Sequence, residues 1–593
     1  MRRSEFGRIL DRVQAGGVTT YVEGLLRPEG KGGRPRQLTV AVFLTAVICA
    51  VDEKEGKLSL TNVHDLLING LARSYRIVLG ITWTDDAGND CSVTQRQVRY
   101  LLEAIELKLA HTQGRAADLT DEDRVTRAAA LQNVLDLLVQ SSLPSHLAAP
   151  GIYALDGTGL ASWGKGRKRT PVDPNADHAE DDDLTINDDN AETALHKRLD
   201  PDAQWGYQTK TYDNKTNYCF GYHAFAMVGL DPVGVDPDIR PKLIEGIALR
   251  PANANAIDPA LTLIDSLIAA GRPVNELLSD REFSYKSEES WAGPLLDRKV
   301  AQVMDIHSKG RGVRDFNGVA MIDGTPHCRA VLGDRDDLII IARPANLSAG
   351  TLKANATDEE REEHATRVRE LAEFRAKIAQ REVAAFRRVS SADENGDERW
   401  ECPAQAGKVI CANCPLSLGY PKDRPVVAEP HQVPALPPRP TPPAKRTKHA
   451  VEQHRQALKA YEKQADVLRC CRQRTITIPG NVTPKQRQRL YWGSDAWIES
   501  FARRTHVEGV FGNMKSTKGA NLKRGWIYVV GIVKTSIMLA CVAFATNLRL
   551  LRSWSERTGD VTDPLCQPLP PSLGFEELDA DGNPDLAVAP PEQ

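Results

Sequence analysis

The sequence predicts an α/β protein: a mixed sheet flanked by helices, preceded by a helical N-terminal domain and interrupted by a long insertion. Apolar residues recur at helical spacing up to about residue 145, and short apolar runs of strand length follow from residue 151. At 593 residues the chain is too long for one hydrophobic core, since such cores stop growing at about 250 to 300 residues. The composition, 41% hydrophobic and 26% charged, is typical of soluble globular proteins.

Residues 1–145 are predicted to form the helical domain. One apolar helix is expected at 38–47, and a second at 92–105, which begins with capping residues and repeats apolar positions at helical spacing. Arg96 and Arg99 fall outside the apolar stripe of the second helix, so they could meet phosphate while the other side packs. A helix-turn-helix that binds DNA ends and a plain helical bundle both fit this pattern.

Residues 150–305 are predicted to form the first part of the sheet. Strands are expected at 152–155, 218–228, 242–250, 274–278 and 300–304, with a helix at 257–270. Three strands followed by alternating helix and strand indicate a mixed sheet with an α/β layer. The acidic stretch 173–202 is too polar to build a core and is predicted to be a mobile insertion.

The rest of the chain is predicted to leave this core and return to it. Residues 306–490 form the insertion, with a β segment, a charged helix at 358–388, a cysteine segment, a Pro-rich linker at 425–443 and a helix ending near 468. Residues 491–552 rejoin the core. Their apolar stretch 526–546 has transmembrane length, but Lys534 within it favours a buried helix. Residues 553–593 are predicted to be a disordered tail.

The formal net charge of −3 conceals strong segregation of charge. Between residues 485 and 524 there are nine Lys and Arg against three Asp and Glu, a local field that would attract a polyanion. The N-terminal segment has no apolar region typical of a secretory signal, so a cytoplasmic location is expected. The eleven cysteines are accordingly expected to be reduced, with metal binding as one use.

Three carboxylates are candidates for one metal site. Asp156 and Asp280 each follow an apolar run, and Glu508 lies in a basic segment predicted to be helical. On one helix, Arg504 at i−4 and Lys515 at i+7 would share the face of Glu508. Taken singly, these residues fit a solvated charged face or a turn. Taken together, they provide the hard oxygen ligands needed by two Mg²⁺ ions about 3.5 to 4 Å apart in phosphodiester cleavage.

The motifs around these carboxylates resemble those of the bacterial insertion-sequence transposases of the DDE class. Their signature Y-x2-R-x3-E-x6-K is similar to Phe501-x2-Arg504-x3-Glu508-x6-Lys515, with Phe501 replacing the tyrosine. The first-Asp, second-Asp and post-Glu motifs resemble Leu155-Asp156-Gly157-Thr158, Leu278-Ser279-Asp280-Arg281 and Leu522-Lys523-Arg524-Gly525. The resemblance covers roughly residues 150–550.

This resemblance implies an RNase H-like catalytic core with an insertion before the Glu-bearing helix. It implies DNA cleavage at transposon ends and strand transfer into target DNA, by a homodimer on paired ends, in the nucleoid and without a membrane. Asp156, Asp280 and Glu508 would bind Mg²⁺, or Mn²⁺ in its place. The implied DNA contacts are Arg504, Lys515, Lys518, Lys523 and Arg524. A catalytically inactive DNA-binding protein derived from a transposase, and a simple RNase H-like nuclease, are the alternatives.

The cysteine segment is a second candidate metal site. Cys402-x8-Cys411-x2-Cys414, with Cys470 and Cys471 downstream, could supply four thiolates for a structural Zn²⁺. The C-x2-C pair is typical of zinc sites, whereas the remaining spacing is irregular. Buried free thiols are the alternative reading.

Overall fold

The computed structural model describes residues 3–27, 36–53, 58–112, 114–164, 200–209, 216–412, 414, 416, 424–433, 435–439, 447–464, 468–516, 519–522 and 527–568. It contains two compact units, and each is described by itself. The first unit comprises residues 1–274 and 505–593, and the second comprises residues 275–504. Each unit combines helices with strands, so the predicted α/β class is confirmed.

The N-terminal part of the first unit is helical, as predicted. Its helices are α1 (Arg3–Ala15), α2 (Val18–Leu25), α3 (Val40–Glu53), α4 (Leu60–Asn69), α5 (Arg73–Val78), α6 (Gln95–Leu109) and α7 (Asp121–Ser141). A short hairpin of β1 (Thr82–Thr84) and β2 (Asp90–Ser92) interrupts them. In α6, Thr94 and Gln97 form a capping box and the predicted apolar stripe is buried, which leaves Arg96 and Arg99 exposed.

The sheet of the first unit is built around β5 (Thr216–Leu230). It pairs antiparallel with β3 (Ile152–Ala161), β4 (Gln204–Thr209) and β6 (Ile244–Pro251). The helix α8 (Ile257–Ala269) packs on β6. The predicted strands at 152–155, 218–228 and 242–250 are confirmed, although β3 is longer than predicted and β4 was not foreseen.

Residues 173–199 of the predicted acidic insertion lie outside the described residues, but its last residues do not form a mobile loop. Asp200 and Asp202 are each 4% exposed. Asp200 accepts hydrogen bonds from Ser162 and Tyr222, and Asp202 accepts one from the backbone N–H of Ile532. A carboxylate can be buried when hydrogen-bond donors of the protein replace its contacts with water. The composition of the acidic stretch does not show where such donors lie in the fold.

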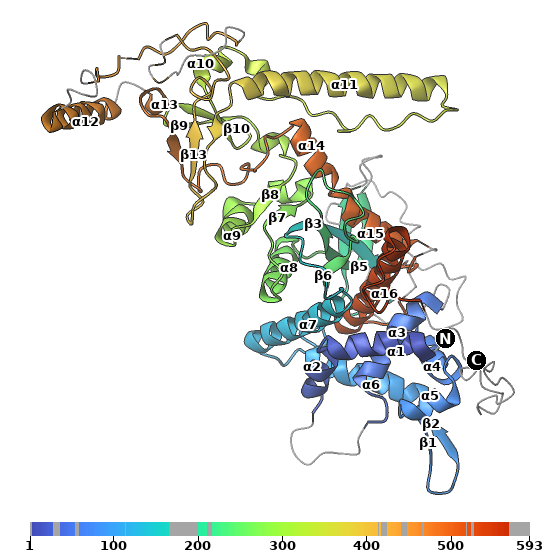
Figure 1. Ribbon diagram of the computed structural model, residues 1–593. Helices are drawn as coiled ribbons and strands as arrows, with labels where there is room; N and C mark the ends of the chain where they lie inside the picture. The colour runs from blue at the N-terminus through green and yellow to red at the C-terminus, as the bar shows by residue number, and fades with distance from the viewer. Residues whose placement is uncertain are drawn as a thin grey trace, which may run out of the picture. The chain divides into compact units, whose positions relative to one another are not determined.

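The apolar stretch near the C-terminus forms the core helix α16 (Ile532–Thr558), which packs against α3, α7 and β6 (Figure 1). It is long and apolar enough to cross a membrane, but 89% of its most apolar window is buried within the protein. This burial agrees with the predicted buried helix. It also corrects the predicted boundary near residue 145, because the N-terminal helices and the sheet share α16 and form one unit.

The predicted disordered tail from residue 553 begins too early. Trp554 and Leu565 are each 4% exposed, and the Arg12 guanidinium lies 2.6 Å from the Asp563 carboxylate. The helix ends where Gly559 adopts φ 76°, and the chain then turns back on the helix bundle. Residues 569–593 of the predicted tail lie outside the described part of the chain.

The second unit contains three groups of strands. The strands β7 (Glu276–Leu278) and β8 (Ala301–Val303) are parallel. Two antiparallel groups follow: β9 (Val313–Phe316), β10 (Val319–Ile322) and β11 (Thr325–His327), then β12 (Arg387–Arg388), β13 (Glu398–Glu401) and β14 (Ile476–Ile478). The strands at 274–278 and 300–304 are thus confirmed in shortened form.

The helices of the second unit include the predicted charged helix, which is α11 (Asp358–Val383) with a capping box from Thr357 and Glu360. The others are α9 (Gly293–Asp297), α10 (Arg329–Leu332), α12 (Lys448–Glu462), α13 (Arg469–Arg472) and α14 (Asp495–Ala502). The residues on the two sides of the predicted boundary at 305 are connected. Hydrogen bonds from Gln302 to the Pro484 carbonyl and from the Met304 amide to Gln488 join β8 to the end of the predicted insertion.

Candidate catalytic site

Asp156 lies in the middle of β3, directly opposite Ala226 on β5. It does not follow the strand end as predicted, because Gly157, Thr158 and Gly159 continue the pairing with β5. Its carboxylate is half-buried and accepts a hydrogen bond of 2.8 Å from the Gly157 amide. Since side chains alternate along a strand, Asp156 and Thr158 share one face of the sheet.

The residue after Asp156 has to be glycine. A Cβ atom at Gly157 would lie 2.8 Å from the Phe225 ring and 2.9 Å from His223 Nε2 on the opposite face of the sheet. The Phe225 and His223 rings pack on each other with centroids 4.5 Å apart, so neither can yield easily. The predicted motif therefore combines a polar face that carries Asp156 with a tightly packed aromatic face behind it.

Helix α15 (Thr505–Lys515) carries Glu508 and Lys515 and packs against β3 and β5 (Figure 1). Glu508 is exposed and Lys515 is half-buried. Lys515 Nζ donates a hydrogen bond of 2.5 Å to Thr158 Oγ1, two residues beyond Asp156. The contact brings the lysine of the Glu motif to the first-Asp motif, although 357 residues separate them along the chain.

The electrostatics around Lys515 involve the same neighbours. Burial lowers the pKa of Lys515, while electrostatic interactions with Cys219 and Asp156 oppose that change. An ammonium group held beside a carboxylate stabilises the ionised form of both. The face of β3 next to α15 thus holds an anionic oxygen ligand, a hydroxyl and a cation.

The predicted single helix over 501–515 is wrong. Helix α14 ends at Ala502 and α15 begins at Thr505, so Arg504 lies in the turn between the two helices and not within the helix of Glu508. Arg503 caps the end of α14: its guanidinium donates hydrogen bonds to the Ser500 carbonyl at 3.3 Å and hydroxyl at 2.7 Å, and it pairs with Glu276 at 3.4 Å. A basic side chain that binds the last carbonyls stabilises a helix end.

Phe501, which replaces the signature tyrosine, has a packing role. Its ring stacks on Trp497 with centroids 4.9 Å apart and an interplanar angle of 7°. On its own side of the break, the Arg504 guanidinium lies 5.6 Å from the centre of the Phe501 ring. An aromatic ring meets both neighbours through its faces, and no hydroxyl is required for either contact.

In the second unit, Asp280 directly follows Ser279 at the end of β7, as predicted. Its side chain accepts a hydrogen bond of 2.6 Å from the Arg281 amide and caps the short 3₁₀ helix Arg281–Tyr285. In the register of the parallel pair, Leu278 lies opposite Val303, so Asp280 and Asp305 each lie two residues past their strands. Parallel strands end at one edge, which places both carboxylates there.

Asp305 and Arg343 were not predicted as site residues. They form an ion pair of 3.0 Å in which Asp305 is only 3% exposed. Burial raises the pKa of Asp305 and lowers that of Arg343. Asp280, Arg281 and Arg504 also act electrostatically on Arg343, so Arg504 belongs to this arginine-rich cluster around the second aspartate. The position of Asp305 after an apolar run is the only sequence signal that could have identified it.

The remaining predicted residues divide into two sets. Lys518, Lys523 and Arg524 lie outside the described residues, and the structure does not address their proposed DNA contacts. Cys402, Cys411, Cys414 and Cys470 line one pocket in the second unit. Within the described part of the chain, no three or more His, Cys, Asp or Glu side chains are arranged to hold a metal ion.

Comparisons of the chain with protein-family models, with curated proteins and with solved structures find no match.

Proposed function

We propose that this chain is a DNA transposase of the DDE class with an RNase H-like catalytic core. The observation that carries the proposal is the hydrogen bond from Lys515 to Thr158. The resemblance assigns these residues to two motifs of one active site, and chain proximity cannot account for their contact. A solvated charged face, the simplest reading of the Glu508 segment, would not require Lys515 to be half-buried against the strand of Asp156.

The chemistry of the donor set fits Mg²⁺, because carboxylate oxygens are the hard ligands that this ion prefers. Asp156, Asp280 and Glu508 would hold it. When bound, Mg²⁺ would activate the attacking hydroxyl or water and stabilise the leaving oxygen of the phosphodiester. Asp156 is held for this role by the Gly157 amide.

The cations of the two units would bind the DNA backbone. Lys515 lies beside Asp156, and Arg504 lies with Arg281 and Arg343 near Asp280. Phosphate contacts position a nucleic acid without reading its sequence. In the proposed reaction, water first frees a 3′-hydroxyl at each transposon end, and this hydroxyl then attacks a target phosphodiester in line.

Two other functions remain as outcomes of the test. A transposase-derived DNA-binding protein would retain the basic surface, including the exposed Arg96 and Arg99 of α6, without cleaving. A simple nuclease would use the same carboxylates but would hydrolyse without joining.

The test combines the purified protein with Mg²⁺, a plasmid target and labelled DNA from both sides of the coding sequence. Joined product supports the transposase. Nicks without joining favour the nuclease, and a mobility shift without cleavage favours the binding protein. Omitting Mg²⁺ should abolish cleavage and leave end binding largely intact.

A further inference from the structure

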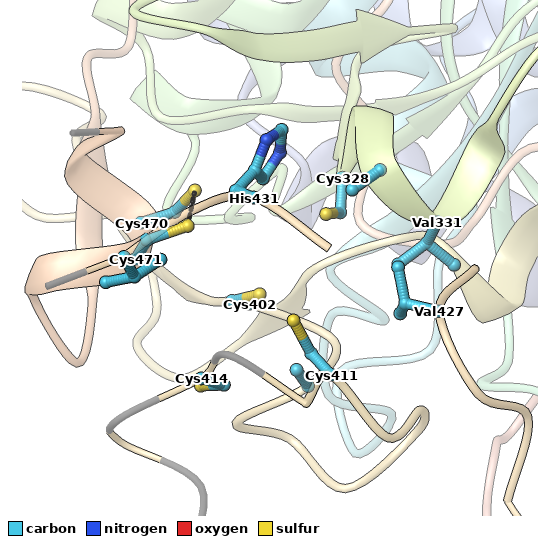
Figure 2. Close-up of a pocket in the computed structure, with 12 residues that line it drawn as sticks. Cys328, Val331, Cys402, Cys411, Cys414, Val427, His431, Cys470 and Cys471 are labelled. Atoms are coloured by element: carbon cyan, nitrogen blue, oxygen red, sulfur yellow. Dashed lines mark hydrogen bonds between the residues drawn. The ribbon is translucent and has the colours of Figure 1, made fainter. Parts of the chain in front are cut away.

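Six of the eleven cysteines gather in one pocket of the second unit. They are Cys328, Cys402, Cys411, Cys414, Cys470 and Cys471, and His431 also lines the pocket. Figure 2 shows them arriving from separate stretches of chain around one space. The cysteines predicted from sequence are thus joined by Cys328 and by the imidazole of His431.

The innermost thiols contact one another. Cys470 Sγ lies 4.0 Å from Cys471 Sγ. Cys328 interacts with the Cys402 thiol and with the His431 imidazole, and the charge of Cys470 acts on Cys402. Two thiolates bound to one tetrahedral Zn²⁺ at 2.3 Å would lie about 3.8 Å apart, close to the separation of the Cys470 and Cys471 sulfurs.

The chain around the pocket is poor in regular structure. Between the end of β13 at Glu401 and the start of α12 at Lys448, the described residues contain only an isolated bridge of Ile410 with Val426. Their apolar packing is modest, since Ala404, Val409 and Val427 are the buried aliphatic residues of this segment. Segments that cannot build a sufficient core are commonly held by a metal or by disulfides.

We propose that this pocket is a structural zinc centre, with Cys328, Cys402, Cys470 and Cys471 as its inner ligands. Soft thiolates select Zn²⁺ over Mg²⁺ or Ca²⁺, and zinc accepts tetrahedral sets of cysteine and histidine. The thiols do not yet enclose one coordination point. Rotation about χ1 between staggered wells moves a cysteine sulfur by about 3 Å, so we expect side-chain rotation to bring the four thiols onto one zinc ion. The Cys411-x2-Cys414 pair and His431 line the same pocket as the inner ligands.

The centre would fasten three parts of the second unit to one another. Cys328 follows β11, Cys402 follows β13, and Cys470 and Cys471 lie in α13. Its role is structural and independent of the proposed DNA chemistry, so either proposal can fail without the other.

The test measures zinc in the full-length protein purified without chelator, by elemental analysis and by release with a mercurial thiol reagent in the presence of a zinc-binding dye. At least about one zinc per chain is expected, with thiol reagent releasing it and lowering the melting temperature. The Cys402→Ser/Cys470→Ser variant should lose the zinc, whereas Cys91→Ser/Cys566→Ser, which changes two half-buried cysteines outside the pocket, should keep it. A folded wild-type protein without zinc, with disulfides among these cysteines, or with iron and acid-labile sulfide instead, would overturn the proposal. This wild-type measurement decides the matter even where the double variant fails to fold.

Discussion

Lys515 and Thr158 are joined by a hydrogen bond of 2.5 Å from the lysine Nζ to the threonine Oγ1. The lysine lies at the end of α15 and the threonine lies two residues past Asp156 on β3. This contact fixes the helix that carries Glu508 against the strand that carries Asp156.

Replacing Lys515 with methionine should lower the rate of DNA-end cleavage by roughly 100-fold, the order expected when one fixed charge is removed from an active site. Thr158→Val keeps the shape of the side chain and removes the hydroxyl that accepts the hydrogen bond from Lys515, so a loss of about tenfold in the cleavage rate is expected. Single-turnover cleavage measures both. Lys108→Met, on an exposed position of α6, is the matched control and should leave the rate unchanged. Equal rates for Lys515→Met and the control would remove Lys515 from the site.

The buried carboxyl of Asp136 in α7 predicts a pH-dependent stability. Burial raises its pKa from 3.8 to about 6, against the opposing hydrogen bonds of Ser266 and Gln132. The folded state therefore binds the proton more tightly than the unfolded state, and stability is lost as pH rises from about 4 to about 6. The difference of about 2.2 between these pKa values corresponds to about 3 kcal/mol.

Asp136→Asn should consequently raise the melting temperature at pH 7 and have little effect at pH 4. Urea unfolding from pH 4 to pH 8 measures the change, with Glu103→Gln on the exposed face of α6 as the control. If Asp136→Asn stabilises the protein equally at pH 4 and at pH 7, protonation of Asp136 is not the cause of the stabilisation.

The stacking of Phe501 on Trp497 predicts that removal of the Phe501 ring destabilises the second unit. Phe501→Ala removes the ring that stacks on Trp497 and should cost about 3–5 kcal/mol in the free energy of unfolding. Phe501→Leu retains most of the volume and should cost about 1–2 kcal/mol. The midpoint of urea unfolding followed by circular dichroism tests this. An alanine variant as stable as the leucine variant would contradict the stacking role.

Much of the fold followed from local patterns. The helix α6 was predicted because Thr94 and Gln97 cap it and its apolar residues recur at helical spacing. The strands β5 and β6 were predicted from mostly apolar runs, and both are largely buried. Such signals lie within a few residues of each other, which is why a single sequence carries them.

The errors arose where distant residues decide the outcome. At the break between α14 and α15, Arg503 pairs with the distant Glu276, and the buried Asp202 accepts a hydrogen bond from the distant amide of Ile532. The thiol pocket could be predicted only in part, because Cys328 and His431 are far in sequence from the C-x2-C pair. Asp305 was not predicted as a site residue, since its place beside the end of β7 depends on the pairing of β7 with β8 in the folded sheet.

The most direct test of the proposed function compares two isosteric changes of neighbouring glutamates, Glu508→Gln on α15 and Glu499→Gln on α14. Both side chains are exposed, so both variants should fold and bind DNA ends like the wild-type protein. In the assay with labelled ends, Mg²⁺ and target plasmid, Glu508→Gln should lose cleavage and joining by at least about 1,000-fold, as should Asp156→Asn and Asp280→Asn. Glu499→Gln should retain both activities. Joined product formed by Glu508→Gln at the wild-type rate would contradict the account.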